Sequence, residues 1–256
     1  MYEIFSSKTN NPHIIVNLMN AMNLIHAYNS IILNYKSWTM IFLSVYFLEG
    51  DNYIYAIGTF LIMMFLAYYV HYCSHLDCLF PYNLTHIEHH NHTNWFSHVI
   101  EILLECSMFI IALSVKNLLG LHFLNEWIIL YFYLFYTTVH NINYSIFHVN
   151  SVHEKHHELM NFNYGPDIFD IIFNTKKNLD SDLENTDHYI WNIVVLTPLV
   201  AFIKYIYNNL SYEYKMLGTC IFGMVSILIL LIFIFSTADL YIESSYIPLK
   251  VNIYLP

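Results

Sequence analysis

Long apolar runs alternate with short polar stretches along most of this chain. Residues 30–48 form the first run, interrupted by Lys36, and residues 49–52 follow as a polar turn. Residues 53–70 form the second run and continue directly into His71. Because an α-helix rises about 1.5 Å per residue and a hydrocarbon core is about 30 Å thick, each run is close to the length of a membrane span. The pattern predicts a helical hairpin with His71 at the end opposite the turn.

The remaining runs predict two further hairpins. Residues 102–139 hold two apolar stretches around a polar middle that includes Lys116 and Glu126. The second of them, residues 127–139, is short for a full crossing, but whether it spans or re-enters the membrane, the chain returns to the side of His71. Residues 189–207 and 216–238 then predict an additional C-terminal hairpin over 189–238, and the last run has no charge.

The other segments are more polar. Residues 1–28 place Ile14, Leu18, Met22 and Ile25 at helical spacing, which predicts an interfacial helix. We expect residues 91–97 to be a loop and the next helix to begin near Glu101. Residues 149–188 are the most polar part of the chain, and we expect a solvated loop after residue 175. The fold class expected is an all-α polytopic integral membrane protein, a single membrane domain over 1–256 with a histidine-rich helical cap on one face.

Composition supports residence in a membrane. Hydrophobic residues make up 57% of the chain and charged residues only 11%, whereas soluble domains carry about a quarter charged residues. The net charge of −10 without a basic block argues against nucleic acid as a partner. More lysines fall on the histidine side than on the other, so the positive-inside rule predicts that the histidine face is cytoplasmic.

Histidines recur at ligand spacing. The motifs are HYCSH at 71–75, HIEHH at 86–90 and HEKHH at 153–157, with one more histidine at position 140. Side chains four apart on a helix point the same way, and adjacent ones diverge by about 100°, so an HxxHH helix can direct ligands at two nearby ions. Two copies of HxxHH arise by chance in on the order of one such chain in a thousand.

Nine imidazoles are more than one ion needs. Neutral imidazole suits iron, zinc or copper, and each ion takes about four to six ligands, so nine suit two ions. The candidate ligands are His71, His75, His86, His89, His90, His140, His153, His156 and His157. We expect His122 and His188 to be structural or solvated, and leave the roles of His92, His98 and His148 open. Glu88, Glu154 and Glu158 lie beside candidate ligands and could accept their ring N–H groups.

At these motifs the chain resembles the fatty acid hydroxylase / sterol desaturase superfamily of membrane diiron oxygenases. The three motifs match that family's HxxxH, HxxHH and HxxHH boxes, and His140 in TTVHNIN matches its lone histidine. After the last box the chain resembles the family's closing pattern at Asn163, Tyr164, Gly165, Asp170 and Thr175, while Phe169 and Asn174 depart from it. The resemblance covers residues 53–175, the expected hydroxylase core, and the C-terminal hairpin lies outside it.

The resemblance implies two iron ions, with zinc as a replacement in isolated protein. It implies a fatty acyl or sterol substrate, O2, and electrons from a separate partner such as cytochrome b5 or a reductase. Four residues are expected to contact the ligands without binding the ions themselves: Glu101, Asn163, Tyr164 and Asp170. The expected location is the endoplasmic reticulum or a related internal membrane.

The residues alone do not decide between several activities. One site serves both hydroxylation and desaturation, and a sterol desaturase or C4-methyl oxidase is the nearest alternative. A haem protein with paired axial histidines fits poorly, because adjacent histidine pairs at a helix exit do not face one another across a bundle. A metal transporter or buffer without redox chemistry is the other alternative, although transporters place polar ligands near the bilayer midplane.

Overall fold

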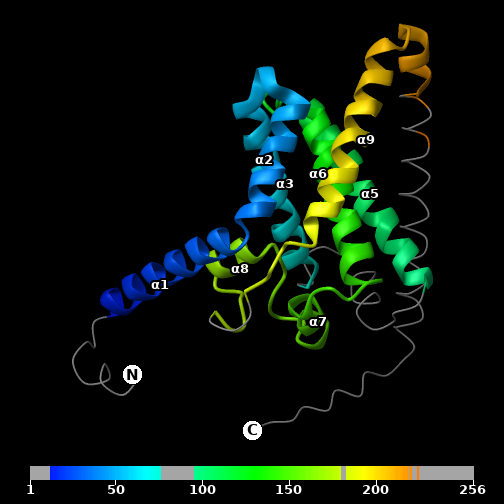
Figure 1. The fold of residues 1–256 in the computed structure, drawn as a ribbon. Coiled ribbons are helices and arrows are strands. Elements are labelled where there is room, and N and C mark those ends of the chain that lie inside the picture. The colour runs from blue at the N-terminus through cyan, green and yellow to red at the C-terminus, as the bar shows by residue number, and fades with distance from the viewer. Residues whose placement is uncertain (1–11, 76–94, 180–182, 219, 221–223, 225–256) are drawn as a thin grey trace.

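The computed structural model describes residues 12–75, 95–179, 183–218, 220 and 224 (Figure 1). These residues form helices and connecting turns without a strand, so the all-α prediction is confirmed for this part of the chain. The order is α1 (Pro12–Leu33), α2 (Tyr35–Glu49), the short helix η2 (Gly50–Asn52), α3 (Tyr53–Ser74), α5 (Trp95–Leu118), α6 (Glu126–Thr138), the π-helical segment η4 (Val139–Tyr144), α7 (Ser151–Glu158), α8 (Asp167–Ile172) and α9 (Tyr189–Asn209).

In the described part of the chain, four long helices pack around α6 to form a bundle. This helix packs against α2, α3, α5 and α9, and α9 also packs against α2. The first helix, α1, leaves the bundle at an angle and packs against α8 (Figure 1). The short helices α7 and α8 lie at the end of the bundle away from the α2–α3 turn. The end of the bundle opposite η2 therefore carries the short helices α7 and α8.

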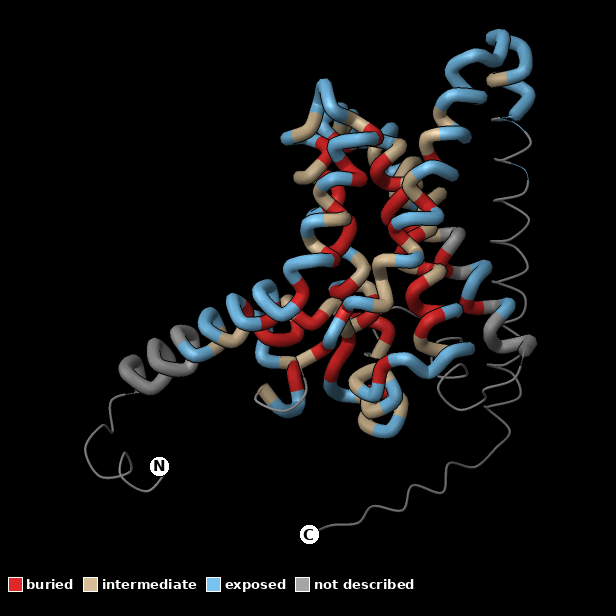
Figure 2. Tube along the Cα trace, in the orientation of Figure 1, coloured by how far each residue is buried: buried red, intermediate tan, exposed pale blue. Residues whose placement is uncertain are grey.

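Aromatic packing between α3 and α6 holds the centre of the bundle. The ring of Phe60 is almost fully buried and contacts Tyr131, Phe132 and Phe135 at centroid distances of 5.4–6.3 Å. Both helices are apolar on nearly every side, which is typical of helices enclosed by other helices or by lipid. Asn125 caps α6 by accepting the Trp127 and Ile128 N–H groups. Figure 2 shows the buried stretches along the inward faces of the helices.

Two predicted boundaries are wrong. The helix predicted from the first apolar run, α2, begins at Tyr35 and not at residue 30. The chain bends at Asn34, and the residues before the bend belong to α1. The Asn34 side chain donates to the Glu184 carbonyl and accepts from Thr186, which fixes the bend. The helix α5 begins at Trp95, so residues 95–97 are helical and not part of a loop.

The solvated loop expected after residue 175 is wrong in part. Lys177, Asn178, Asn185 and Asp187 are exposed, as expected. Lys176, however, is buried and forms an ion pair with Asp167, and Glu184 and Thr186 are buried against the bend between α1 and α2. The two buried charges have a partner of opposite charge or hydrogen-bond donors, which offset the cost of burial.

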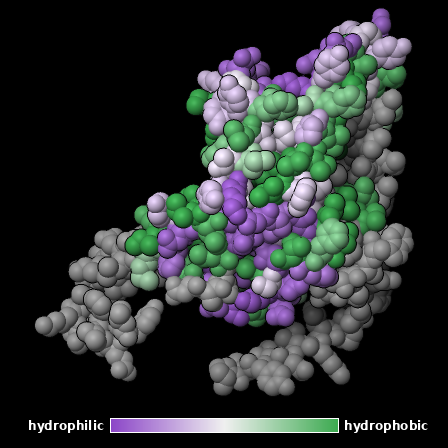
Figure 3. All heavy atoms as spheres, viewed as in Figure 1, coloured by the Kyte–Doolittle hydropathy of each residue, from purple (hydrophilic) through white to green (hydrophobic). Residues whose placement is uncertain are grey.

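Two helical stretches are long and apolar enough to cross a membrane, Tyr35–Ser74 and Tyr189–Asn209. The first is the α2–α3 hairpin, folded back on itself at residues 50–52. On the face shown in Figure 3, hydrophobic side chains gather over the middle of the bundle and hydrophilic ones at its two ends. The second arm of the predicted C-terminal hairpin, residues 216–238, lies almost entirely outside the described residues.

Candidate metal centre

Six of the candidate histidines lie together at the polar end of the bundle. They come from three separate segments: His71 and His75 from the end of α3, His140 from η4, and His153, His156 and His157 from α7. Neighbouring ring centroids are 4.7 Å apart for His71 and His156, and 4.9 Å for His140 and His153. The remaining three candidates, His86, His89 and His90, lie outside the described residues, as does His92.

Main-chain carbonyls fix the ring orientation of two of these histidines. His71 Nδ1–H donates to the Tyr164 carbonyl oxygen at 2.6 Å, and His156 Nδ1–H donates to the Phe162 carbonyl oxygen at 2.7 Å. Because a carbonyl oxygen can only accept, each Nδ1 carries the proton. In a neutral imidazole the lone pair then sits on Nε2, the atom that would bind a metal ion.

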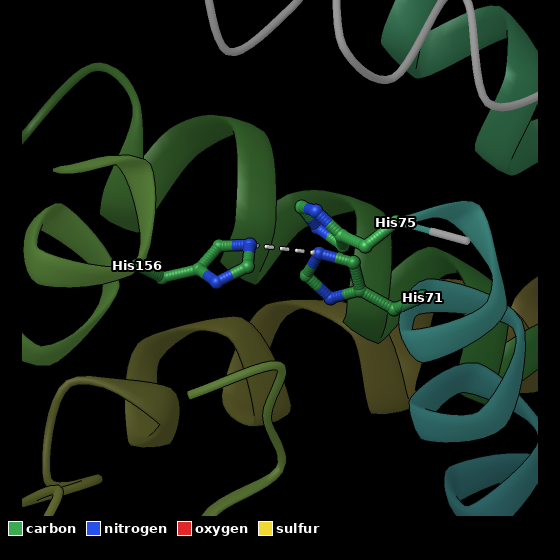
Figure 4. Close-up of side chains that lie close together, drawn as sticks. All are labelled: His71, His75 and His156. Carbon is green, nitrogen blue, oxygen red and sulfur yellow. Dashed lines mark hydrogen bonds between the residues drawn. The ribbon is translucent and has the colours of Figure 1, made fainter. Parts of the chain in front are cut away.

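The two Nε2 atoms face one another at 3.1 Å (Figure 4). Two nitrogens that lie about 2.1 Å from one ion, at an angle of about 90–110°, are about 3.0–3.4 Å apart. His75 completes this group, since ligand atoms of His71, His75 and His156 all lie within 4.8 Å of one another. Two lone pairs at this distance repel without a cation or a proton between them, so the geometry fits ligands of one ion.

A second group of histidines lies beside the first. His153 and His157 are one helical turn apart on α7, and their Nε2 atoms are 3.0 Å apart. The π-helical winding of η4 places His140 against His153, with the two rings almost perpendicular. Segments of π-helix are rare and occur often at functional sites. The distance between the His153 and His157 Nε2 atoms fits two ligands of one ion, and the His140 ring lies beside them.

Glu105 is the residue that sequence reasoning missed. One oxygen of this carboxylate accepts His140 Nδ1–H at 2.5 Å, and the other accepts Asn141 Nδ2–H at 2.7 Å. Glu101, one turn earlier on α5, lies 3.7 Å from the same nitrogen. All of these side chains are buried. The available signal was a pair of glutamates four residues apart within an apolar stretch, a spacing that directs both side chains to one face of a helix.

The carboxylates govern the protonation of His140. Burial alone would lower the pKa of this imidazole, but Glu105 and then Glu101 raise it to about 9. With this pKa the metal-free imidazole carries a proton on both nitrogens near neutral pH. A metal ion at Nε2 would displace one proton, while the hydrogen-bonded carboxylate keeps the other on Nδ1. Glu101, Glu105 and His140 are also close enough to hold an ion themselves, with ligand atoms within 4.8 Å of one another.

Asp170 supports the histidines from the turn after α7. Its carboxylate accepts the Tyr164 and Gly165 N–H groups at 3.0 and 2.6 Å, and the Thr175 hydroxyl donates to it at 2.7 Å. These bonds hold the peptide whose carbonyl orients His71. Burial raises the pKa of Asp170 to about 6, against the lowering effect of its donors. The predicted supporting residues Glu101, Tyr164 and Asp170 thus lie beside the histidines, and so does Asn163, which lines the adjoining cavity.

Two glutamates within the histidine motifs are described by the structure, and neither orients a candidate ligand. Glu154 lies 3.4 Å from His148 Nδ1, away from the motif histidines, and Glu158 is exposed. Glu88 lies outside the described residues. The expectation that Glu154 accepts a ligand's ring N–H is therefore wrong. The carbonyls of residues 162 and 164 and the Glu105 carboxylate accept those ring protons, because they lie inside the bundle where the rings converge.

A buried carboxyl network borders the site on its other side. The ring of Tyr144 stacks on His153 at 4.7 Å, and its hydroxyl donates to Glu184. Glu184 also accepts from Tyr189 and Asn150. Burial, together with the nearby Asp167 charge, raises the pKa of Glu184 to about 7, against the lowering effects of these donors and of Lys176.

A cavity joins the histidines to the apolar interior of the bundle. His71, His140 and His153 line one part of it. Its apolar wall comes from α2, α3 and α6 and consists of Trp38, Ile41, Phe60, Met64, Phe132, Phe135, Tyr136 and Val139. The rest of the lining is polar and includes Asp167, Asp170 and Glu184. The cavity thus has an apolar wall and a polar part, and the histidines lie in its lining.

The chain matches no family model, no curated protein and no solved structure. What the site can do therefore follows from its own geometry. The described residues contain histidine and carboxylate groups that could hold a metal ion, at the end of an all-helical bundle.

Proposed function

We propose that this protein is an O2-dependent diiron oxygenase that hydroxylates a lipid, either a fatty acyl chain or a sterol, at a membrane face. One observation carries the proposal: imidazoles from α3, η4 and α7 converge, with the Nε2 atoms of His71 and His156 3.1 Å apart and both Nδ1 protons held by main-chain carbonyls. Two bound iron ions would supply the activation of O2 that attack on an unactivated C–H bond requires.

The chain's own residues position the ligands in this proposal. His71, His75 and His156 would hold one ion. His153 and His157, whose Nε2 atoms are 3.0 Å apart, would hold the other with His140 and the histidines of residues 86–90. The Tyr164 and Phe162 carbonyls and the Glu105 carboxylate keep the Nδ1 protons in place, so that each Nε2 lone pair stays available. Such outer partners fix the tautomer of a ligand and raise its basicity.

The cavity is the proposed binding site for the lipid. Its apolar wall excludes water from the chain that it holds, while the histidines lie at one part of its lining. A buried apolar chain is held in a defined position relative to the ions, which restricts attack to a few carbons. Hydroxylation and desaturation differ only in the fate of the substrate after hydrogen removal, so product analysis separates them.

The bundle is the proposed membrane domain. On α9, Trp191 is 76% exposed and Val195 61%, and on α2 Phe47 is 68% exposed. An enclosed helix of a soluble protein would bury such side chains, whereas lipid would cover them. The helix α1 lies at the interface in this arrangement, and residues 53–175 form the hydroxylase core.

The histidine face is the proposed cytoplasmic side. Lys155 and Lys176 lie near the histidines, whereas Lys116 and Lys204 pair with Glu126 and Glu49 at the other end of the bundle. A separate electron donor such as cytochrome b5 or a reductase would dock on this face, in the endoplasmic reticulum or a related internal membrane.

The direct test compares His156→Ala with His122→Ala. His156 is fully buried within the histidine cluster, whereas His122 is exposed in the turn before α6. We expect wild-type protein and the His122 variant to purify with two equivalents of iron or zinc. We expect both to consume O2 when reduced and to add one oxygen atom to a host lipid, as read by mass spectrometry. The His156 variant should insert into membranes but lose metal and product.

Other outcomes point to the alternatives. Full activity of the His156 variant would contradict the assignment. Bound metal without O2 consumption would favour a metal-binding or transport protein, and a Soret absorption band would favour a haem protein. Loss of two hydrogens from the lipid, without a gain of oxygen, would identify a desaturase, and a sterol product would identify the sterol branch of the same chemistry.

A further inference from the structure

Asn163 lies in the turn between α7 and α8 and is held on two sides. Its backbone is in the left-handed region, with φ of 60°, which asparagine tolerates better than most residues. Its N–H donates to the Thr175 carbonyl oxygen at 2.9 Å. Its side-chain oxygen accepts the Lys177 N–H at 3.2 Å. Because a backbone N–H can only donate, the amide atom facing it must be Oδ1, which settles the orientation of the side chain.

This orientation leaves the Nδ2 group as a buried donor. Asn163 is only 4% exposed, and its Nδ2 atom has no hydrogen-bond partner among the residues that the structure describes. A buried donor without a partner is costly, and native proteins leave few of them unexplained. The residue lines the same cavity as His71, His140 and His153.

The other buried unpaired polar atoms differ in position. They are Tyr131 Oη, Thr137 Oγ1, Asn141 Oδ1 and His188 Nε2. None of these residues lines the cavity, whereas Asn163 does. Asn174 supplies a comparison for the backbone: it has a similar φ of 58° but is exposed. A left-handed turn residue therefore needs no burial, and the buried amide of Asn163 calls for a separate explanation.

We propose that Asn163 Nδ2–H donates a hydrogen bond to an oxygen atom of the lipid substrate. The inference rests on the proposed function and deepens it, because it names the residue that recognises the hydroxyl or carbonyl oxygen of the lipid. The bond holds the oxygen-bearing end of the lipid beside Asn163, with the hydrocarbon along the apolar wall of the cavity.

The test measures binding and does not require turnover. Two brominated probes, 9,10-dibromooctadecan-1-ol and 9,10-dibromooctadecane, differ only by the hydroxyl group. Trp38 lines the cavity, so a probe bound there quenches its fluorescence, and Trp38→Phe identifies the part of the signal that comes from the cavity. We expect wild-type protein in lipid nanodiscs to bind the alcohol roughly tenfold more tightly than the hydrocarbon, the effect of one buried hydrogen bond.

One variant removes the donor without adding a group that could bind the alcohol. Asn163→Gly suits the left-handed backbone and deletes the amide. It should reduce the preference for the alcohol to about twofold or less. Asn174→Gly, the same change at an exposed residue of similar φ, should keep the wild-type ratio. Because each ratio is taken within one variant, a general loss of stability affects both probes alike.

An unchanged ratio in Asn163→Gly, an equal loss in Asn174→Gly, or the absence of saturable binding by wild-type protein would overturn the inference. The oxygenase proposal fails separately, through absent metal or absent O2 consumption. Oxygenase activity together with an unchanged probe ratio would refute only the role of Asn163.

Discussion

Replacing Glu105 by glutamine tests whether this carboxylate orients a metal ligand. The carboxylate accepts two hydrogen bonds, from His140 Nδ1–H at 2.5 Å and from Asn141 Nδ2–H at 2.7 Å. Glutamine has nearly the same shape but only one acceptor oxygen, so its NH2 group must face one of the two donors. Both Glu105 and His140 are buried, so water does not readily replace the lost acceptor.

When the glutamine NH2 group faces His140, the ring proton must move to Nε2, where it blocks the ligand atom. Loss of such an outer partner weakens metal binding about 10- to 100-fold, which corresponds to about 1.4–2.8 kcal/mol. The assay titrates metal-free protein with zinc against a competing chelator and follows helix content by circular dichroism. One of two binding steps should weaken by this amount, and the other should change little.

Glu126→Gln is the matched control, because this glutamate pairs with Lys116 at the opposite end of the bundle. Its affinities should equal those of the wild type. Two affinities within twofold of wild type in Glu105→Gln would refute the reasoning. Complete loss of one equivalent of metal, even at saturating zinc, would instead place Glu105 among the direct ligands.

Three further predictions concern the framework of the site. Asp170→Asn should lower the unfolding free energy by about 2–3 kcal/mol, because it weakens the bonds to two backbone N–H groups, whereas the exposed Asp187→Asn should change it by less than about 0.5 kcal/mol; thermal unfolding in detergent compares them, and equal shifts would contradict the prediction. The pKa of Glu184 is raised to about 7 from an ordinary value of 4.5, so the folded state binds more protons than the unfolded state between these values, and stability should fall as pH rises from about 4.5 to 7. Thermal unfolding midpoints measured across this range check the sign, and Glu184→Gln should flatten the dependence. Phe60→Ala should cost about 3–5 kcal/mol, because this buried ring packs against three aromatic residues of α6, while Phe47→Ala at an exposed position of α2 should cost far less; similar costs would show that the α3–α6 contact does not form the core.

Local spacing was enough to predict much of the candidate site. The interval between His71 and His75 and the HxxHH pattern at His153–His157 state which side chains share a helix face, and helix geometry does not depend on the rest of the chain. Apolar runs likewise predicted α2, α3, α6 and α9, because helices of that length and composition are stable only where water is excluded. The boundaries at Asn34 and Trp95 failed, since packing and side-chain bonds between distant segments decide where those helices bend and begin.

The sequence could not predict which atoms accept the ring protons of the histidines. Glu154 adjoins a candidate ligand in the chain but contacts His148, whereas Glu105 lies 35 residues before His140 and contacts its Nδ1. The Tyr164 carbonyl that orients His71 is a backbone atom, which no residue pattern can mark. The charges of Lys176 and Glu184 predicted exposure to solvent. Both side chains are buried, because their partners come from other segments.

The sequence by itself determined that this chain is apolar and helical, and that its histidines occur in groups able to grip metal ions from one helix face. Those properties depend on residues within a few positions of one another. Only the tertiary structure decided which imidazoles of α3, η4 and α7 meet at ligand distance within that face, and which atoms hold the ring protons. The reason is physical: a helix sets the direction of its own side chains, but the contact between helices depends on packing across the whole core.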